Sequence, residues 1–183
     1  SLKIKIPILT FYTFSTENWK RPKREIGFLF KLIDHYFNKE IDNLVKSNIR
    51  INIIGNIKTL PKKVKARLIE SMKRTIKCKK ILVNLAINYG SKDEIIKAAN
   101  AIRRKKAFFS IKNFESNFYT KGIPNPDILI RTGGKKRLSN FLLWQLAYTE
   151  LYFIDKLWPD FKIEDYQRII THFKKVKRNF GKI

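Results

Sequence analysis

Hydrophobic and polar residues follow one another along this chain in a pattern that predicts short buried strands separated by amphipathic helices. Ile4–Phe14 is β-branched and aromatic throughout, and similar shorter runs occur at Arg50–Gly55 and Ile81–Ala86. Between them, Glu25–Val45 and the segment after Pro61 repeat apolar residues at helical spacing. Strands that alternate with helices favour an α/β fold built on a parallel sheet.

The second half of the chain continues this alternation. Ser91 and Glu94 have the spacing of a capping box, which predicts a helix beginning there, and Asn113–Tyr119 is expected to form a short helix. Short strands are expected at 128–130 and 151–153, and a last amphipathic helix includes Tyr166, Ile169, Ile170, Phe173 and Val176. No repeat or linker interrupts the pattern. We therefore expect a single domain over residues 1–183, with a mostly parallel sheet flanked by helices on both faces.

Composition supports a folded protein and raises a question about charge. The 183 residues are 44% hydrophobic and 13% aromatic, as in globular domains. Forty Lys and Arg against 15 Asp and Glu give a net charge of +25. Such an excess suggests nucleic acid, anionic membrane or anionic small molecules as partners. Because the charge is scattered along the chain, a general coding bias toward lysine explains it equally well.

Cysteine and histidine content indicates a reducing compartment and no zinc site. Cys78 is the single cysteine, so no disulfide forms within the chain. His35 and His172 are far apart and have no cysteine at metal-binding spacing. No apolar run approaches the length of a membrane span, and no signal-peptide pattern is present. A cytoplasmic location is expected.

The richest candidate chemistry lies between Asp127 and Phe161. A short apolar strand ends at Arg131, Gly133-Gly134 makes a turn, and three cations follow at 135–137. Ser139 is positioned to cap a helix that begins at Asn140, so a Gly turn, cations and a helix N-terminus predict an anion site. Glu150 is the carboxylate near this basic cluster and suits a hard cation such as Mg²⁺. The alternative is an ordinary strand-to-helix connection with solvated lysines.

A second polar segment, Ser15–Pro22, follows the first predicted strand. Loops at the carboxyl ends of parallel strands bind ligands in α/β proteins. Here Ser15 offers a hydroxyl, Asn18 an amide and Arg21 a five-donor fork. The alternative is a plain polar turn in which Trp19 closes the core.

Two motifs in these segments resemble those of the cis-prenyltransferases, the undecaprenyl diphosphate synthase family. They are FSTENWKRP at 14–22 and RTGGKKRLSNFLLWQLAYTELYFIDKLWPDF at 131–161. The resemblance implies an Mg²⁺-dependent transferase that condenses isopentenyl diphosphate onto an allylic, farnesyl-type diphosphate with cis geometry. Its product would be an undecaprenyl-type polyprenyl diphosphate, used as a cell-wall lipid carrier.

The resemblance also implies roles for individual residues. Asn18 would assist proton removal, Glu150 would bind Mg²⁺, and the 25–45 helix would wall a tunnel for the growing chain. Substrate would be bound by Ser15, Thr16, Glu17, Trp19, Arg21, Arg131, Arg137, Leu138 and Ser139. Family members form homodimers, here through the apolar side chains of 150–161. The product is expected to bring the protein into peripheral contact with a membrane. No specific nucleic acid is expected as a partner.

Three features depart from the family pattern. Members begin with a strand and a loop reading roughly MDGNGRWA, which carries the main Mg²⁺ aspartate, and nothing similar occurs here. Ser91 and Lys92 stand where a glycine and an arginine are usual, and Lys135 replaces a common glutamate. We therefore expect an N-terminally truncated copy that lacks the first strand and helix and is impaired in catalysis. The alternative is a non-catalytic basic binding protein, either a degenerate prenyltransferase subunit or a nucleic-acid binder.

Overall fold

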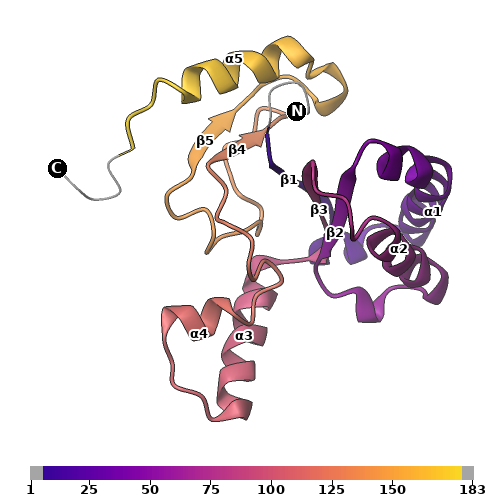
Figure 1. Cartoon of the computed structure of the whole chain (residues 1–183), viewed down its shortest axis with the longest axis vertical. Coiled ribbons are helices and arrows are strands. Elements are labelled where there is room, and N and C mark those ends of the chain that lie inside the picture. Colours follow the sequence, from indigo (N-terminus) through magenta and orange to yellow (C-terminus); the bar gives the residue numbers. More distant parts are fainter. Residues whose placement is uncertain (1–5, 179–183) are drawn as a thin grey trace. The chain divides into compact units, whose positions relative to one another are not determined.

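A computed structural model describes residues 6–178, and the chain divides into two compact units, Ser1–Lys121 and Gly122–Ile183. The first unit contains a three-stranded parallel sheet in the order β1-β3-β2 (Figure 1). Its strands are β1 (Ile8–Ser15), β2 (Ile49–Ile54) and β3 (Ile81–Tyr89). The central strand β3 pairs with both neighbours, so β1 and β2 are the edges of this sheet.

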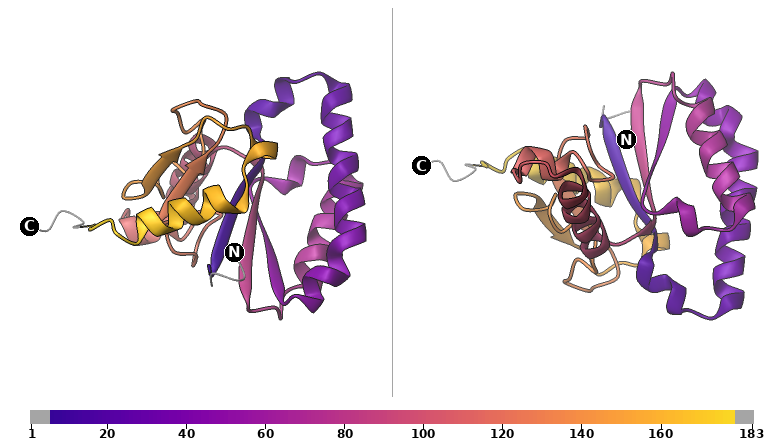
Figure 2. Two further views of the ribbon diagram at one scale, coloured as in Figure 1. Left: turned by 90° about the horizontal axis from the view of Figure 1, so that it is seen from above. Right: turned by 90° about the horizontal axis from the view of Figure 1, so that it is seen from below.

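Two helices, α1 (Lys23–Lys46) and α2 (Lys62–Arg74), pack side by side on one face of this sheet (Figure 2). Their apolar stripes meet Phe14 of β1 and Ile87 of β3 in a core made of Phe14, Ile26, Phe30, Leu60, Val64, Leu68 and Ile87. Burying each large apolar side chain stabilises the fold by about 1.5–3 kcal/mol. This core is what orders the ends of the three strands, where the polar loops begin.

Polar side chains cross the same sheet at one register level. The Asn52 amide donates to Asn84 Oδ1 at 2.8 Å, and the Asn84 amide donates to Thr10 Oγ1 at 3.2 Å. Thr10 and Asn52 are the pairing partners of Asn84 in the two parallel ladders. A one-residue slip of either strand would leave the buried Asn84 unsatisfied, so this row fixes the register.

A helical hairpin completes the first unit. It consists of α3 (Ser91–Lys105) and α4 (Ile111–Glu115), closed over Ala98, Ile102, Phe114 and Phe118. The predicted capping box is wrong: Gly90 is the N-cap residue of α3 and no side chain caps the helix. Glu94 is buried instead, accepting from the Tyr89 hydroxyl at 2.6 Å and from the Tyr119 amide at 2.7 Å. Burial and the Glu94 charge raise the pKa of Tyr89, so it stays protonated and donates.

The second unit contains two parallel strands, β4 (Ile128–Arg131) and β5 (Glu150–Phe153), and the helix α5 (Ile163–Phe173). Two side-chain contacts join α5 to the segment of β5. The Tyr152 hydroxyl lies 2.9 Å from His172 Nδ1, and Lys156 pairs with Asp165 at 2.7 Å.

The helix predicted to begin at Asn140 does not form. Residues 139–148 are turns, and Ser139, Asn140 and Leu142 have φ values of 51°, 61° and 45°. An α-helix requires consecutive right-handed residues, and three left-handed residues within four positions prevent one. Ser139 therefore caps no helix.

The α/β class is confirmed, with parallel pairing throughout and flanking helices, although β1 begins at Ile8 and the predicted strand residues before position 6 lie outside the described part. α1, α2 and α3 lie where their patterns predicted, and β3 runs three residues further than expected, to Tyr89. The single domain over 1–183 stays a prediction. Within residues 6–178, no helix is both long and apolar enough to cross a membrane.

Candidate active site

The first group of predicted site residues lies on the loop that leaves β1. Thr16–Lys20 form a single turn of 3₁₀-helix directly after the strand. The Ser15 backbone amide donates to Asn18 Oδ1 at 2.9 Å, which orients the Asn18 amide. Thr16 Oγ1 lies 3.2 Å from Asp93 Oδ2 at the start of α3. The loop is thus held at both its beginning and its middle.

Trp19 combines the two interpretations that the sequence left open. Its ring meets Phe14 and Phe30 edge-on, with centroids 5.4 and 5.7 Å apart, so it does close the core. It nevertheless keeps 40% of its surface exposed, and its indole N–H donates to Asn88 Oδ1 at 2.7 Å. Trp19 is therefore a fixed apolar surface beside the loop.

Asn88, near the end of β3, is one of the site residues that the sequence did not single out. It is buried and takes a left-handed conformation with φ 50°. Its amide group donates to the Asn56 carbonyl at 2.7 Å and to Thr59 Oγ1 at 2.8 Å, while its oxygen accepts from Trp19. One side chain near the end of β3 therefore connects the loops that follow β1 and β2.

A cavity of about 450 Å³ opens among these loops. It is lined by Thr16, Trp19, Asn56, Thr59, Asn88, Gly90, Asp93, Lys97 and Tyr119. Seven of these nine residues were not singled out from the sequence, although their places after β2 and β3 are where α/β folds bind ligands. The negative charge of Asp93 offsets the positive charge of Lys97. The Lys97 ammonium lies 3.8 Å from the Tyr119 ring centroid. The cavity lining by itself offers little net charge to a diphosphate.

Arg21 lies just beyond this loop and is paired with Glu25, Nη1 to Oε1, at 2.6 Å. The two side chains are nearly half exposed and one helical turn apart, so the pair is weak. An incoming phosphate can displace Glu25 at little cost. Arg21 is thus a cation that can be drawn to a ligand rather than a buried anchor.

The second group lies in the other unit, on the loop that leaves β4. The Arg131 guanidinium donates to Ser139 Oγ at 2.8 Å and to the carbonyl oxygen of Arg137. Burial, followed by the charge of Arg137, lowers the pKa of Arg131. The structure therefore places the Arg131 guanidinium against the Ser139 hydroxyl and the Arg137 backbone, and the binding of an anion by these residues stays a prediction.

The glycine turn fixes this loop against the chain that leaves β5. Gly133 and Gly134 have φ values of 87° and 68°, and their amides donate to Lys156 O at 2.8 Å and Ile154 O at 3.0 Å. Lys135, Lys136 and Arg137 are exposed, and Leu138 is half-buried. Since no helix begins at Asn140, any anion bound here relies on these cations and Ser139, not on a helix N-terminus.

Glu150 is the first residue of β5 and lies opposite Ile128 in the ladder. Within residues 6–178, no three Asp, Glu, His or Cys side chains gather closely enough to hold a metal ion. One carboxylate suits Mg²⁺ only in the mode in which substrate phosphates and water supply most ligands. The protein groups at Glu150 fit a metal that arrives with a diphosphate, and they do not fit a permanently bound one.

Comparisons with known proteins agree with this chemistry. The chain is 39% identical to an isoprenyl transferase of Oceanobacillus iheyensis, covering 100% of this chain and 75% of that protein. It is 41% identical to an isoprenyl transferase of Thermotoga maritima, over 99% of this chain and 80% of the relative.

Two solved structures share the fold. A probable undecaprenyl diphosphate synthase from Campylobacter jejuni superimposes with a TM-score of 0.91 at 40% identity, covering 99% of this chain and 86% of that one. Lavandulyl diphosphate synthase from Lavandula x intermedia, solved with dimethylallyl diphosphate, gives a TM-score of 0.92 at 30% identity, covering 98% and 81%.

The chain has an α/β fold, two loops after its strands that carry arginine, and relatives that are prenyltransferases. It is therefore a prenyltransferase. The family described as putative undecaprenyl diphosphate synthase matches residues 1–181, and the chain belongs to it.

Proposed function

We propose that this prenyltransferase elongates a prenyl chain with cis geometry, joining isopentenyl diphosphate to an allylic, farnesyl-type diphosphate. The observation that carries the proposal is the group of Arg131, Arg137 and Ser139 on the loop after β4. Guanidinium forks form the strong paired hydrogen bonds that diphosphate oxygens accept. We assign this group, together with the half-buried Leu138, to isopentenyl diphosphate.

The loop after β1 supplies the remaining roles. Ser15, Thr16, Glu17 and Arg21 bind and orient substrate near the reacting carbons, with Trp19 as the apolar surface. Asn18, already oriented by the Ser15 amide, assists removal of the proton that the condensation releases. The 2.9 Å contact holds the Asn18 side chain in one place before substrate arrives, which lowers the cost of ordering it.

Glu150 is the residue that we assign to Mg²⁺, in company with the substrate's phosphates. When bound there, Mg²⁺ supplies charge neutralisation to the departing diphosphate. Because Glu150 is a single carboxylate, the protein alone should bind Mg²⁺ weakly. Titration calorimetry should show Mg²⁺ binding to the protein only when a diphosphate is present, and Glu150→Gln should weaken that binding.

The polypeptide of residues 1–183 should catalyse slowly by itself. Within the described residues, no group of three Asp, Glu, His or Cys side chains forms that could hold Mg²⁺ firmly at Glu150. Removing one element that stabilises transition-state charge commonly costs about a hundredfold in rate. We also propose an undecaprenyl-type product and a cytoplasmic enzyme, which product chain length and cell fractionation would test.

Self-association is a further part of this proposal. Leu151, Leu157 and Trp158 expose 44%, 62% and 63% of their surface, and all three lie within the 150–161 segment. Such a group of apolar side chains suits a homodimer interface. Sedimentation of the folded protein at tens of micromolar should show a dimer that Trp158→Ser weakens, and a monomer would contradict this.

Binding of isopentenyl diphosphate tests the central assignment. Hydrogen bonds to charged groups contribute about 1.5–3 kcal/mol each, so Arg131→Ala should weaken binding by about 10- to 100-fold. Lys136→Ala, which removes an exposed cation of the same loop, is the matched control and should change affinity less than threefold. Equal losses in the two variants would reduce the site to general charge attraction.

A further inference from the structure

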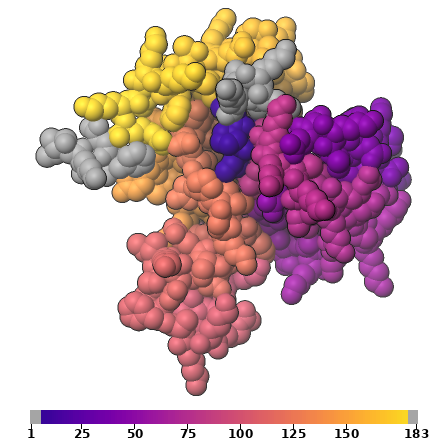
Figure 3. Space-filling model, in the orientation of Figure 1, coloured from indigo at the N-terminus to yellow at the C-terminus, as the bar shows by residue number. Residues whose placement is uncertain are grey.

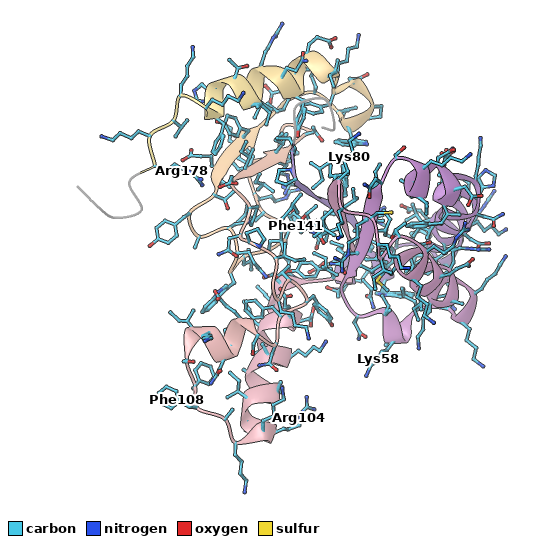
Figure 4. All side chains as sticks on the ribbon, viewed as in Figure 1. Lys58, Lys80, Arg104, Phe108, Phe141 and Arg178 are labelled. Carbon is cyan, nitrogen blue, oxygen red and sulfur yellow. The ribbon has the colours of Figure 1, made fainter. Side chains whose placement is uncertain are left out.

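The connection between α3 and α4 displays apolar side chains that nothing in its own unit covers. Among the large apolar residues of 6–178, Phe108 is the most exposed at 81%, and Phe109 and Ile111 expose 64% and 68%. Figure 4 labels Phe108 and Arg104 on this hairpin, and Figure 3 draws the surface of the hairpin in the same orientation. We call residues 103–112 the aromatic turn.

Hydrogen bonds and packing order the backbone of the aromatic turn. Lys106 ends α3 in a left-handed conformation with φ 49°, and the Asn113 amide group donates to the Phe108 carbonyl at 2.9 Å. Ser110 caps α4 by accepting from the Asn113 backbone amide at 3.2 Å. The buried rings of Phe114 and Phe118 anchor the base, and Phe109 contacts Phe114 with centroids 5.5 Å apart. Phe108 is thus held outward by an ordered backbone.

Positive charge surrounds these apolar side chains. Five exposed cations occupy ten positions: Arg103, Arg104, Lys105, Lys106 and Lys112. From Ile95 to Pro126 the sequence contains a single acidic residue, Glu115. The three apolar side chains Phe108, Phe109 and Ile111 are therefore flanked by these five cations, which we call the basic collar. Almost no acidic residue opposes them.

We propose that the aromatic turn docks the protein on an anionic lipid bilayer. Exposed rings that enter the boundary between headgroups and acyl chains, with Lys and Arg at the phosphates, are the chemistry of interfacial anchoring. The aliphatic stems of the flanking cations extend the apolar contact while their charges stay at the headgroups. This inference does not depend on the proposed substrates.

Two other occupants, a second copy of this chain and a single-stranded nucleic acid, suit this turn less well. A second copy of this chain that presented the same turn would bring its five cations against these five, so like charge would oppose self-association there. Single-stranded nucleic acid would satisfy the cations and stack on Phe108, but Ile111 offers no ring for stacking. An anionic bilayer uses all three apolar side chains and the whole basic collar.

Vesicle sedimentation of the full chain tests the proposal at 0.15 M salt. The probes are phosphatidylcholine vesicles with and without 30 mol% phosphatidylglycerol, and the variant is Phe108→Ser/Phe109→Ser, which leaves every charge in place. Ile76→Ser is the matched control, because Ile76 is 60% exposed and also stands among cations. Far-UV circular dichroism verifies that each variant is folded.

We expect the wild type and Ile76→Ser to bind the anionic vesicles with similar affinity. Neither should bind vesicles of pure phosphatidylcholine. Loss of two phenyl rings from the interface should weaken binding at least tenfold, given their apolar area. Undiminished binding by the double variant would mean that the net charge alone attracts lipid, and would overturn the proposal. So would a double variant that loses only self-association in sedimentation velocity, or only affinity for oligo(dT).

Discussion

Replacing Asn88 should loosen the loops after β1 and β2 from the end of β3. In Asn88→Ala the chain loses the acceptor for the Trp19 indole and the two donors that hold Asn56 O and Thr59 Oγ1. Each hydrogen bond contributes about 1 kcal/mol net, which gives about 3 kcal/mol for the three. An alanine at φ 50° adds about 1 kcal/mol of backbone strain. We expect the free energy of unfolding to fall by about 4 kcal/mol.

Two companion variants separate these contributions. Asn88→Gly removes the side chain without the strain, so the free energy of unfolding should fall by about 3 kcal/mol. Asn88→Asp keeps an acceptor for Trp19 but turns a buried carboxylate toward Asn56 O, so it should cost at least as much as Asn88→Gly. Only Asn88→Asp should retain the wild-type emission of Trp19, read as the difference from the same protein with Trp19→Phe.

Urea unfolding followed by far-UV circular dichroism measures the stabilities. The reasoning fails if Asn88→Gly stays within about 0.5 kcal/mol of the wild type, the usual range for surface changes. It also fails if Asn88→Asp shifts Trp19 emission as much as Asn88→Ala does. A double-mutant cycle between Trp19→Phe and Asn88→Gly should give a coupling of about 1 kcal/mol, and zero coupling would contradict the hydrogen bond.

Three further predictions concern packing, pH and charge. Gly55→Ala should lower the free energy of unfolding strongly in urea, because the added Cβ would lie 2.1 Å from Ile87 O. Gly27→Ala in α1 has open space around the added Cβ and should raise the free energy of unfolding by about 0.5–1 kcal/mol. Equal effects of the two variants would contradict the close approach at Gly55. Hydrogen bonds from Lys63 and Arg67 lower the pKa of Asp34 below 3.8. The stabilisation from these bonds is therefore complete above pH 3.8 and is lost as the pH falls through the lowered pKa. Over that acidic range the urea midpoint of the wild type should drop more than that of Asp34→Asn. Mixed-sequence DNA should bind weakly at about 0.2 M salt, and tight retention on a duplex would favour the nucleic-acid alternative.

Hydrophobic periodicity was sufficient to predict the layered elements of this fold. α1, α2 and the central strand β3 follow directly from their apolar spacing, because each buries a single stripe or a whole strand in one core. The Gly133-Gly134 turn and the approach of Arg131 to Ser139 also followed from local sequence, since a strand, a tight turn and a cation cluster leave few other arrangements.

The errors arose where tertiary contacts override local preference. Ser139 and Asn140 have the composition of a helix start, yet both are left-handed, a choice that spacing does not encode. Glu94 has the position of a capping-box acid but is buried against Tyr89 and Tyr119, which lies 25 residues away. Asn88 connects residues 29, 32 and 69 positions distant, so no local signal identified it.

A single-turnover assay tests the proposed elongation most directly. Excess enzyme is mixed with farnesyl diphosphate, radiolabelled isopentenyl diphosphate and Mg²⁺, and the extracted products are separated by chain length and double-bond geometry. Slow formation of longer prenyl diphosphates with new cis double bonds is predicted. At subsaturating isopentenyl diphosphate, Arg131→Ala should slow it by about 10- to 100-fold, and Lys136→Ala by less than about threefold. All-trans products, no label in prenyl products over hours, or equal activity in Arg131→Ala would contradict the account.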